Sequence, residues 1–480
     1  MTRTLTLLLA LVLLAGCAGI GSAPTATADP TPPPEASALP EATDPPEPTA
    51  MLTAPPTATT EPLPSATPEA TEPPAATATP DGAEGPGDGA GAVVAAWVRD
   101  GDLIVKRLPD GEEVAITDLG DVVEFPEFSP DGQLILFRRQ GPVATVSPDP
   151  GAEVPTTTLW AVPVDGGTPR MVLDPLAALP AVPGSGALAD DLYPSDAGRL
   201  AWLPGGFQVL FSSRFLTVNS ALGNHDLWRL DLETGQLDEL LPAGQGGRPT
   251  LSPDGEQVLL SAPEELAVAR ADGTERRTLL TFERVPTYSE WEWVPEPGWN
   301  DDGSLHVALA QPWQAGRPVT YTLLRLDPAS GESQELGEVE VPWLHTPLWS
   351  PDGSRLAYIA AGSGLVMAGA GGEDPRLVAA GETSIPLAWS PAGTRLAFVR
   401  EGQYCVAEAA GEDAEPLCVA PTWDAAVYWL DEETLVVMAD AGEDQPQLQA
   451  IELPAGTATE LWTAPGAPLY YDLYVGQVGQ

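Results

Sequence analysis

Basic residues are scarce in this chain of 480 residues, in which 21 Lys and Arg stand against 69 Asp and Glu. The resulting formal net charge of -48 repels nucleic acid phosphates and anionic lipid headgroups. Lys106 is the only lysine. We therefore expect no nucleic acid partner, and a soluble, strongly acidic surface.

Histidine is also rare, and His225, His306 and His345 share no spacing that is typical of metal ligands. The two Gly-Ser-Gly stretches at 184–186 and 362–364 do not match the Gly-x-Ser-x-Gly elbow of a serine hydrolase. The sequence thus predicts no metal site, no cofactor and no catalytic residue, and favours a protein without enzymatic activity.

Aromatic and basic side chains are missing from residues 22–90, which consist mainly of Pro, Thr, Ala, Glu and Ser. Such a segment cannot bury enough apolar surface to offset the entropy lost on ordering. We interpret residues 17–90 as a disordered, partly polyproline spacer that precedes a folded domain at residues 91–480.

The spacer contains no long apolar run. One such run, Leu5–Leu14, lies before the spacer and follows the single positive charge of Arg3. It is too short to favour a spanning helix and indicates a signal peptide over residues 1–16. The stretch LAGC at 14–17 resembles the lipobox of bacterial lipoproteins. The resemblance implies that Cys17 carries fatty acyl chains such as palmitate. It also implies export and lipid anchoring to the outer face of the bacterial cell membrane or to the outer membrane. An ordinary signal peptide is the alternative.

Only two further cysteines occur, Cys405 and Cys418. They flank AAGEDA at 409–414, where a hairpin would place the two cysteines directly opposite each other on paired strands. Export favours oxidation, so we predict a disulfide, with two buried free thiols as the alternative.

A short turn motif recurs along the folded part, as in WSPDGSRLAY at 349–358. In this motif proline presets φ, aspartate caps backbone amides and glycine accepts a positive φ, so the chain reverses between two strands. The motif is followed each time by an apolar strand. Its copies begin at residues 128, 202, 251, 299, 349, 389 and 429.

A second set of glycine turns divides each unit into four short strands, and the shortest units are 40 residues long. This period is typical of a propeller blade. The first unit, from residue 93, lacks its innermost strand, and APLYYDLYV from 467 is a strand without a partner. Joining the two protects the sheet edges. We therefore predict an all-β fold, a single β-propeller of eight four-stranded blades closed by the C-terminal strand, with seven blades as the alternative.

The repeats resemble the WD40-like propeller repeat of TolB-type proteins, most closely at 349–358 and, with Ala392 in place of aspartate, at 389–398. The resemblance covers residues 91–480. It implies the fold but not the function, because such propellers serve as scaffolds, partner-binding domains and gates of peptidases.

Long connections are unevenly distributed, and strand alternation places five of them on one face: 139–158, 175–198, 214–225, 283–298 and 311–319. Loops on a rigid scaffold commonly carry binding residues, and Trp with Arg is typical of interaction hot spots. The alternative is that the aromatic residues only pack over their own loops. The predicted ligand-binding residues are Tyr193, Arg214, His225, Tyr288, Trp291, Trp293, Trp313, Arg317, Trp343 and His345.

These features favour a lipid-anchored, monomeric propeller of the cell envelope that binds a protein, peptide or glycan through its loop-rich face without catalysing a reaction. The alternative is a cell-envelope hydrolase or lyase that acts on a glycan or peptide with carboxylates in the propeller channel.

Overall fold

The structure is a computed structural model, and it describes residues 93–475 apart from short internal segments. These segments are 121–122, 145–153, 182–192, 217–220, 288–291, 313–315, 411–414, 443–444 and 465–469. The predicted signal peptide, Cys17 and the predicted spacer lie outside the described residues. No helix among the described residues is long and apolar enough to cross a membrane.

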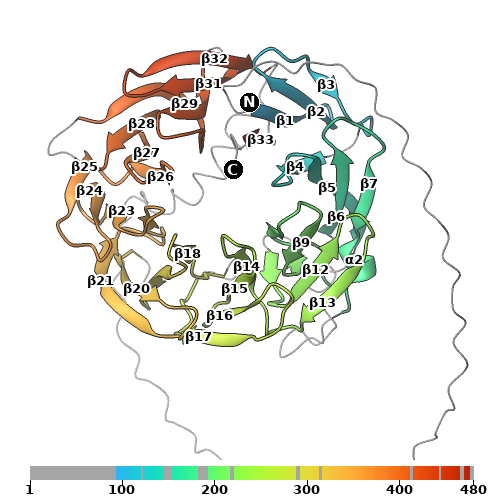
Figure 1. The fold of residues 1–480 in the computed structure, drawn as a ribbon, viewed down its shortest axis with the longest axis horizontal. Coiled ribbons are helices and arrows are strands. Elements are labelled where there is room, and N and C mark those ends of the chain that lie inside the picture. Colours follow the sequence, from blue (N-terminus) through green and yellow to red (C-terminus); the bar gives the residue numbers. More distant parts are fainter. Residues whose placement is uncertain are drawn as a thin grey trace, which may run out of the picture. The chain divides into compact units, whose positions relative to one another are not determined.

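The described chain is built almost entirely of antiparallel strands, so the predicted all-β class is confirmed. Most of the strands form four-stranded sheets, and Figure 1 shows these sheets placed in chain order around a common centre. Strands such as β4, β14 and β18 lie nearest the centre, and β7, β13 and β17 lie outermost (Figure 1). The arrangement is propeller-like.

The first two sheets lie side by side and contain both ends of the described chain. The first has the order β3-β2-β1-β33, with β1 (Val93–Arg99), β2 (Asp102–Leu108), β3 (Val114–Ala115) and β33 (Tyr471–Val475). The second consists of β4 (Val123–Phe128), β5 (Leu134–Ala144), β6 (Val154–Pro163) and β7 (Arg170–Leu173), which is followed by the short helix α2 (Pro175–Ala178).

The middle of the chain forms four further sheets. The third sheet has the order β13-β12-β9-β8, with β8 (Leu200–Trp202), β9 (Gln208–Phe211), β12 (Leu227–Asp231) and β13 (Leu237–Leu241). The hairpin β10 (Arg214–Leu216) and β11 (Ala221–Gly223) extends from it. The fourth consists of β14 (Arg248–Leu251), β15 (Gln257–Ser261), β16 (Glu265–Arg270) and β17 (Arg277–Thr281).

The fifth sheet consists of β18 (Gly298–Trp299), β19 (Leu305–Ala310), β20 (Val319–Leu326) and β21 (Ser333–Val341). The sixth consists of β22 (Leu348–Trp349), β23 (Arg355–Ala360), β24 (Gly364–Gly369) and β25 (Arg376–Ala380). In each of these two sheets the strands follow one another in sequence order, so every connection between neighbouring strands is a hairpin.

The last described part is a seven-stranded sheet in which one long strand belongs to two halves. Its strands are β26 (Ile385–Trp389), β27 (Arg395–Arg400), β28 (Gln403–Glu408), β29 (Leu417–Trp429), β30 (Thr434–Asp440), β31 (Pro446–Glu452) and β32 (Thr457–Thr463). The register between β29 and β30 shifts between Thr422 and Val427, so β29 pairs with β28 through its first part and with β30 mainly through its last.

The C-terminal strand pairs with the N-terminal one, as the unmatched strand in the sequence predicts. β33 runs antiparallel to β1, with Val93 opposite Val475 and Trp97 opposite Tyr471. β33 also contacts β4 of the next sheet, where the backbone N–H of Phe128 donates a hydrogen bond to Asp472. The two ends of the described chain are therefore part of one sheet.

The recurring turns have the geometry that their residues favour. In the copy at 349–358, Asp352 Oδ1 accepts hydrogen bonds from Ser350 Oγ at 2.6 Å and from the backbone N–H of Ser354 at 3.0 Å. Gly353 has a φ of 68°, a conformation that side chains with a Cβ disfavour. These contacts identify the turn aspartate as a cap of its own turn.

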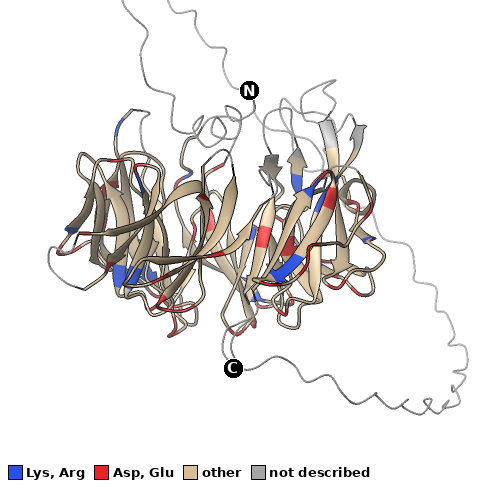
Figure 2. Ribbon diagram, turned by 90° about the horizontal axis from the view of Figure 1, so that it is seen from above, with Lys and Arg blue, Asp and Glu red and all other residues tan. Residues whose placement is uncertain are grey.

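The core lies between neighbouring sheets, because middle strands of the sheets, such as β15 and β16, are buried along most of their length. Trp97 of β1 packs against Trp462 of β32 with 4.2 Å between ring centroids. Indole nitrogens make further links: that of Trp389 donates to the carbonyl of Leu348 in the sixth sheet at 3.0 Å. That of Trp429 donates to the carbonyl of Ala388 at 3.4 Å, and so links the two halves of the seven-stranded sheet. Acidic residues are spread over strands and turns throughout the described chain (Figure 2).

The predicted disulfide is confirmed. Cys405 of β28 lies opposite Cys418 of β29, and the two sulfur atoms are bonded. The side chain of Cys405 is fully buried in the core, so the bond crosses from the interior to the outer strand of this blade-like half-sheet.

Candidate functional site

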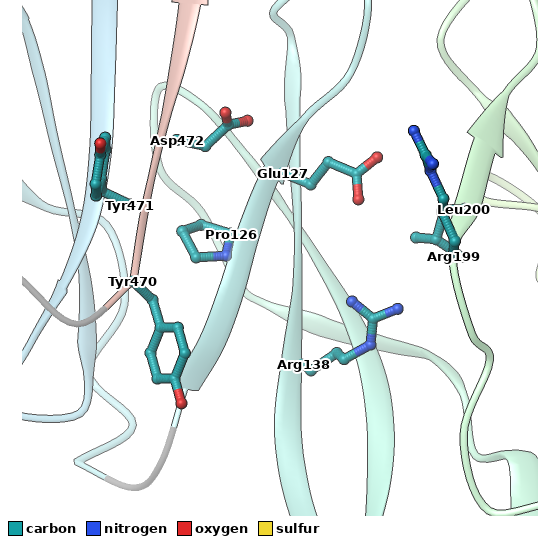
Figure 3. A pocket seen from close by; sticks show the side chains of 8 residues that line it. All are labelled: Pro126, Glu127, Arg138, Arg199, Leu200, Tyr470, Tyr471 and Asp472. Carbon is teal, nitrogen blue, oxygen red and sulfur yellow. The ribbon is translucent and has the colours of Figure 1, made fainter. Parts of the chain in front are cut away.

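A pocket of about 450 Å³ lies between the inner strands of the first three sheets. Its walls come from the end of β4, from β5, from the start of β8 and from the start of β33 (Figure 3). The lining residues combine two carboxyl groups, two guanidinium groups and two phenol rings: Pro126, Glu127, Arg138, Arg199, Leu200, Tyr470, Tyr471 and Asp472. This mixture of charge and apolar surface is typical of a small-molecule site.

The contact of Glu127 differs from the contact that the equivalent position makes at two other places in the fold. The position of Glu127 directly before Phe128 corresponds to Leu348 and Ala388, whose backbone carbonyls accept an indole hydrogen bond. Here the indole nitrogen of Trp202 donates to Oε1 of the Glu127 side chain instead, at 2.7 Å. The carboxyl group is therefore oriented toward the junction with the third sheet.

Burial raises the pKa of Glu127, and the negative charge of Asp472 adds to that effect. The hydrogen bond from Trp202 and the positive charges of Arg138 and Arg199 act in the opposite direction but do not cancel the rise. A glutamic acid of this kind keeps its proton at a higher pH than an exposed one, which suits a proton donor.

Asp472 is the second carboxyl group of the pocket. Its Oδ2 accepts a hydrogen bond of 2.9 Å from the backbone N–H of Phe128, which joins β33 to β4. Burial raises the pKa of Asp472, while this backbone hydrogen bond and one from Leu473 lower it in part. The two carboxyl groups thus come from chain segments that are far apart in sequence and share one electrostatic environment.

Arg138 lies beneath Glu127 in Figure 3 and is held by its neighbours. Its Nε lies 3.5 Å from Oδ1 of Asp196, and its guanidinium group donates to the carbonyl of Gly198. Asp196 also binds Arg214, whose Nε donates to Oδ2 at 2.8 Å. Burial opposes ionisation of Asp196, but the charges of Arg214 and Arg138 outweigh burial and lower its pKa. Asp196 is therefore a buried carboxylate between two guanidinium groups.

Tyr471, the first residue of β33, is held in place by a buried network of hydrogen bonds. Asp424 accepts hydrogen bonds from the hydroxyls of Tyr471 and Tyr404, the latter at 2.8 Å. Burial raises the pKa of both phenols, and the negative charge of Asp424 adds to the effect. Asp424 lies in the irregular part of β29, so this network attaches β33 to the seven-stranded sheet.

The structure places the predicted ligand-binding residues in several different environments. Tyr288, Trp291 and Trp313 lie outside the described residues. Tyr193 and Arg317 are exposed, whereas Trp343 and His345 are partly buried, and burial lowers the pKa of His345. None of the predicted residues that the structure describes lines the pocket, and Arg214 approaches it only through Asp196.

Two further predicted residues have partners within the chain. Trp293 is 6% exposed and packs against Phe282 and Tyr321, with 6.3 Å between ring centroids in both pairs. His225 Nε2 lies 3.2 Å from Oε2 of Glu292, which also pairs with Arg284. In this loop the packing interpretation therefore describes Trp293 better than the binding interpretation.

The sequence-based prediction missed Glu127 and Asp472, although both carry a local signal. Each is a carboxyl residue with apolar or aromatic neighbours on an inner strand, Glu127 in VEFPEF at 123–128, which also contains Glu124, and Asp472 in YYDLYV at 470–475. Acidic residues rarely occupy such positions without a partner or a function. Among the described residues, no group of three or more His, Cys, Asp or Glu side chains is placed to hold a metal ion.

Comparison with known proteins finds no matching family model. A curated relative, an uncharacterized protein of Agrobacterium fabrum, is 25% identical over 266 residues, which cover 50% of this chain and 85% of the relative. This relative brings no activity to the comparison.

Similar solved structures include proteins with different activities. An oligogalacturonate lyase from Vibrio parahaemolyticus is 15% identical with a TM-score of 0.40, over 70% of this chain and 86% of that one. A puromycin hydrolase is 20% identical with a TM-score of 0.37, over 80% and 55%. TolB from Acinetobacter baumannii is 13% identical with a TM-score of 0.33, over 79% and 82%. They accord with a propeller-like fold.

These comparisons correct the functional prediction. The sequence favours a binding protein without enzymatic activity, but the similar solved structures are mostly enzymes, among them the lyase, the hydrolase and prolyl endopeptidases. These neighbours contradict the preference for a protein without enzymatic activity. That preference depended on the absence of serine, cysteine and histidine motifs from the sequence.

Proposed function

We propose that this chain is a cell-envelope hydrolase or lyase that cleaves a glycan or peptide by acid–base chemistry in the pocket between β4, β8 and β33. The observation that carries the proposal is the pair Glu127 and Asp472, two partly buried carboxyl groups with raised pKa values that line one cavity. Perturbed carboxyl pairs in a cavity are a common feature of acid–base catalysts.

The two carboxyl groups have different surroundings, which suggests different roles. Asp472 accepts a backbone hydrogen bond that favours its ionised form, so we assign it as the general base. The charge of ionised Asp472 helps to keep the proton on Glu127, so we assign Glu127 as the general acid that protonates the leaving oxygen or nitrogen. Such a pair titrates as a unit, with one group ionising before the other.

Carboxamide variants of the purified protein test this proposal. A panel of polysaccharides and peptides is incubated with wild-type protein, and new reducing ends, new amino termini and ultraviolet absorbance of unsaturated products are measured. Glu127→Gln and Asp472→Asn should each lower the rate by about 10²- to 10⁴-fold. Glu256→Gln, an exposed turn variant, is the control. Full activity in both pocket variants, with wild-type turnover, would refute the assignment.

For the architecture we propose eight blades. The supporting argument is that the seven-stranded sheet divides where β29 changes partner, so its two halves each resemble the four-stranded sheets before them. In this description β33 supplies the inner strand of the first blade. An experimental structure in which these two halves form one continuous flat sheet would contradict the blade count.

We also propose that the enzyme is exported and anchored by lipid at Cys17, with residues 17–90 as a spacer. The support is the lipobox-like LAGC stretch and the composition of the segment that follows it. Incorporation of a clickable palmitate analogue in a bacterial host should be lost in Cys17→Ser and retained in Cys405→Ser. Equal labelling of the Cys17→Ser variant would exclude this anchor.

A further inference from the structure

We infer that the pocket binds a carboxylate-bearing sugar unit of a glycan, and that Arg199 is the residue that binds its carboxylate. This inference rests on the proposed function and narrows its substrate to acidic glycans. Three observations support it: the guanidinium groups around the cavity, the absence of a hydrogen-bond or ion-pair partner for one of them among the described residues, and the phenol rings in the lining.

The first argument is local charge. The chain as a whole has a formal charge of -48, yet the pocket and the wall behind it bring the guanidinium groups of Arg138, Arg199 and Arg214 together with only three carboxyl groups, those of Asp196, Glu127 and Asp472. The local balance of charge is therefore far less negative than that of the whole chain. A substrate carboxylate is repelled less here than over the rest of the acidic surface.

The second argument concerns the availability of Arg199. Arg138 is occupied by Asp196 and the carbonyl of Gly198. Arg199, by contrast, has neither a hydrogen bond nor an ion pair to any other residue in the described part of the chain, and it is exposed. Figure 3 shows its side chain facing the cavity on the same side as Glu127. A planar guanidinium group in this state can bind a carboxylate through two parallel hydrogen bonds.

The third argument distinguishes a sugar from an acidic peptide. Tyr470 lies across from the arginines near Pro126, and Tyr471, which also lines the pocket, is drawn on the other side of β33 (Figure 3). The hydroxyl of Tyr471 is bound to Asp424, which holds its ring in place. A fixed aromatic ring provides a flat apolar face for the C–H groups of a sugar ring. A cavity of about 450 Å³ is also small, which suits a short sugar segment better than an extended peptide.

A binding experiment with a matched pair of ligands tests the inference. A galacturonate trimer and its fully methyl-esterified form have the same sugar units, but the ester has a methyl group in place of the negative charge on each carboxyl group. Calorimetric titration of the full-length protein should give at least about 10-fold tighter binding of the acid, the factor that one charge-assisted hydrogen-bond pair of about 1.4 kcal/mol supplies. Arg199→Gln should remove this preference, whereas Arg317→Gln, which replaces an exposed arginine outside the pocket, should keep it.

The outcomes separate this inference from the proposed function. Equal affinity for acid and ester, no binding of either, or an unchanged preference in Arg199→Gln would overturn the inference. Cleavage of a neutral glycan that depends on Glu127 and Asp472 would leave the proposed function intact while the inference fails. Binding of the acid without cleavage of any glycan or peptide would support the inference and contradict the proposed function. Circular dichroism of Arg199→Gln confirms that the variant is folded.

Discussion

The indole nitrogen of Trp202 donates a 2.7 Å hydrogen bond to Oε1 of Glu127, and so joins the inner strand of one sheet to a carboxyl group on the inner strand of the preceding sheet. At two other junctions the corresponding indole bonds to a backbone carbonyl. The indole at the junction between the second and third sheets therefore has a titratable side chain as its hydrogen-bond acceptor. Trp389 and Trp429 have a backbone carbonyl in the same role.

Replacing Trp202 by Phe should shift the titration of Glu127. The indole hydrogen bond favours the ionised form, so its loss should raise the pKa of Glu127 further. Because Glu127 acts as the general acid and must be protonated, this change should move the basic limb of the activity profile to higher pH. Trp389→Phe is the control, because its indole bonds to the carbonyl of Leu348. Both variants should lose about 1 kcal/mol of stability in urea unfolding, but only Trp202→Phe should alter the pH profile. Identical profiles for both variants would show that Glu127 does not control the rate.

The stability difference between variant and wild type should change with pH in opposite directions for Glu127→Gln and Asp254→Asn. Burial raises the pKa of Glu127, so the folded state binds this proton more tightly than the unfolded state. Its contribution to stability is complete below the ordinary value of 4.5 and is lost as the pH rises through the folded-state value. Glu127→Gln is neutral at every pH, so its stability relative to wild type should increase as the pH rises through this range.

Asp254→Asn should show the opposite trend. Hydrogen bonds from Ser252 and from the backbone N–H of Glu256 lower the pKa of Asp254, so its contribution is present above the ordinary value of 3.8 and is lost as the pH falls. The variant should therefore be most destabilised, relative to wild type, at neutral pH. Urea unfolding curves from acidic to neutral pH measure both trends, and parallel slopes for the two variants would contradict the expected difference in sign.

The sequence predicts the turns and the strand pairing better than the pocket, for a physical reason. The turn at Ser350 and Asp352 and the disulfide at Cys405 depend on residues close together in the chain, whose spacing determines the contact. The pairing of β33 with β1 was also predictable, because an apolar strand without a partner must be covered. Glu127 and Asp472 meet only after neighbouring sheets have packed, and a single sequence does not contain the relative orientation of those sheets.

The loop-based site remains a prediction, and those of its residues that the structure describes have different surroundings. Loop length identifies an elaborated face but does not distinguish an aromatic residue that faces solvent from one that fills its own loop. Trp293 is buried against Phe282 and Tyr321, and His225 is bound to Glu292. Arg214 belongs to the neighbourhood of the pocket only because Asp196 lies between it and Arg138.

Removal of the disulfide should cost about 3 kcal/mol in the chain-entropy treatment of a loop of this size. Cys405 and Cys418 are separated by 13 positions, and the side chain of Cys405 is fully buried. Urea unfolding of the Cys405→Ser, Cys418→Ser double variant should therefore show a lower midpoint than oxidised wild type. Reduced wild type should fall to a similar midpoint, and the reductant should leave the double variant unchanged. A wild-type midpoint insensitive to reductant would show that the bond adds no stability.

Glu432 replaces the missing turn aspartate of the copy at 389–398. The position of Asp352 is occupied there by Ala392, and the carboxylate of Glu432, from the next turn along the chain, accepts hydrogen bonds from Ser390 Oγ at 2.9 Å, from the backbone N–H of Ala392 and from Thr394. Glu432→Ala should therefore destabilise the protein by about 2 kcal/mol, since it leaves several donors without an acceptor. Glu433→Ala, which removes the neighbouring carboxylate, is the control.

Whether Ala392→Asp stabilises or destabilises the protein should then depend on the presence of Glu432. In the Glu432→Ala background, Ala392→Asp restores a carboxylate to the turn, so stability in urea unfolding should recover by about 1 kcal/mol. In the wild-type background the same substitution places two carboxylates on one set of donors, and their repulsion should lower stability. The double-mutant cycle should thus give a coupling energy well above the few tenths of a kcal/mol expected for independent sites. Additive effects would show that Glu432 does not act as the cap of this turn.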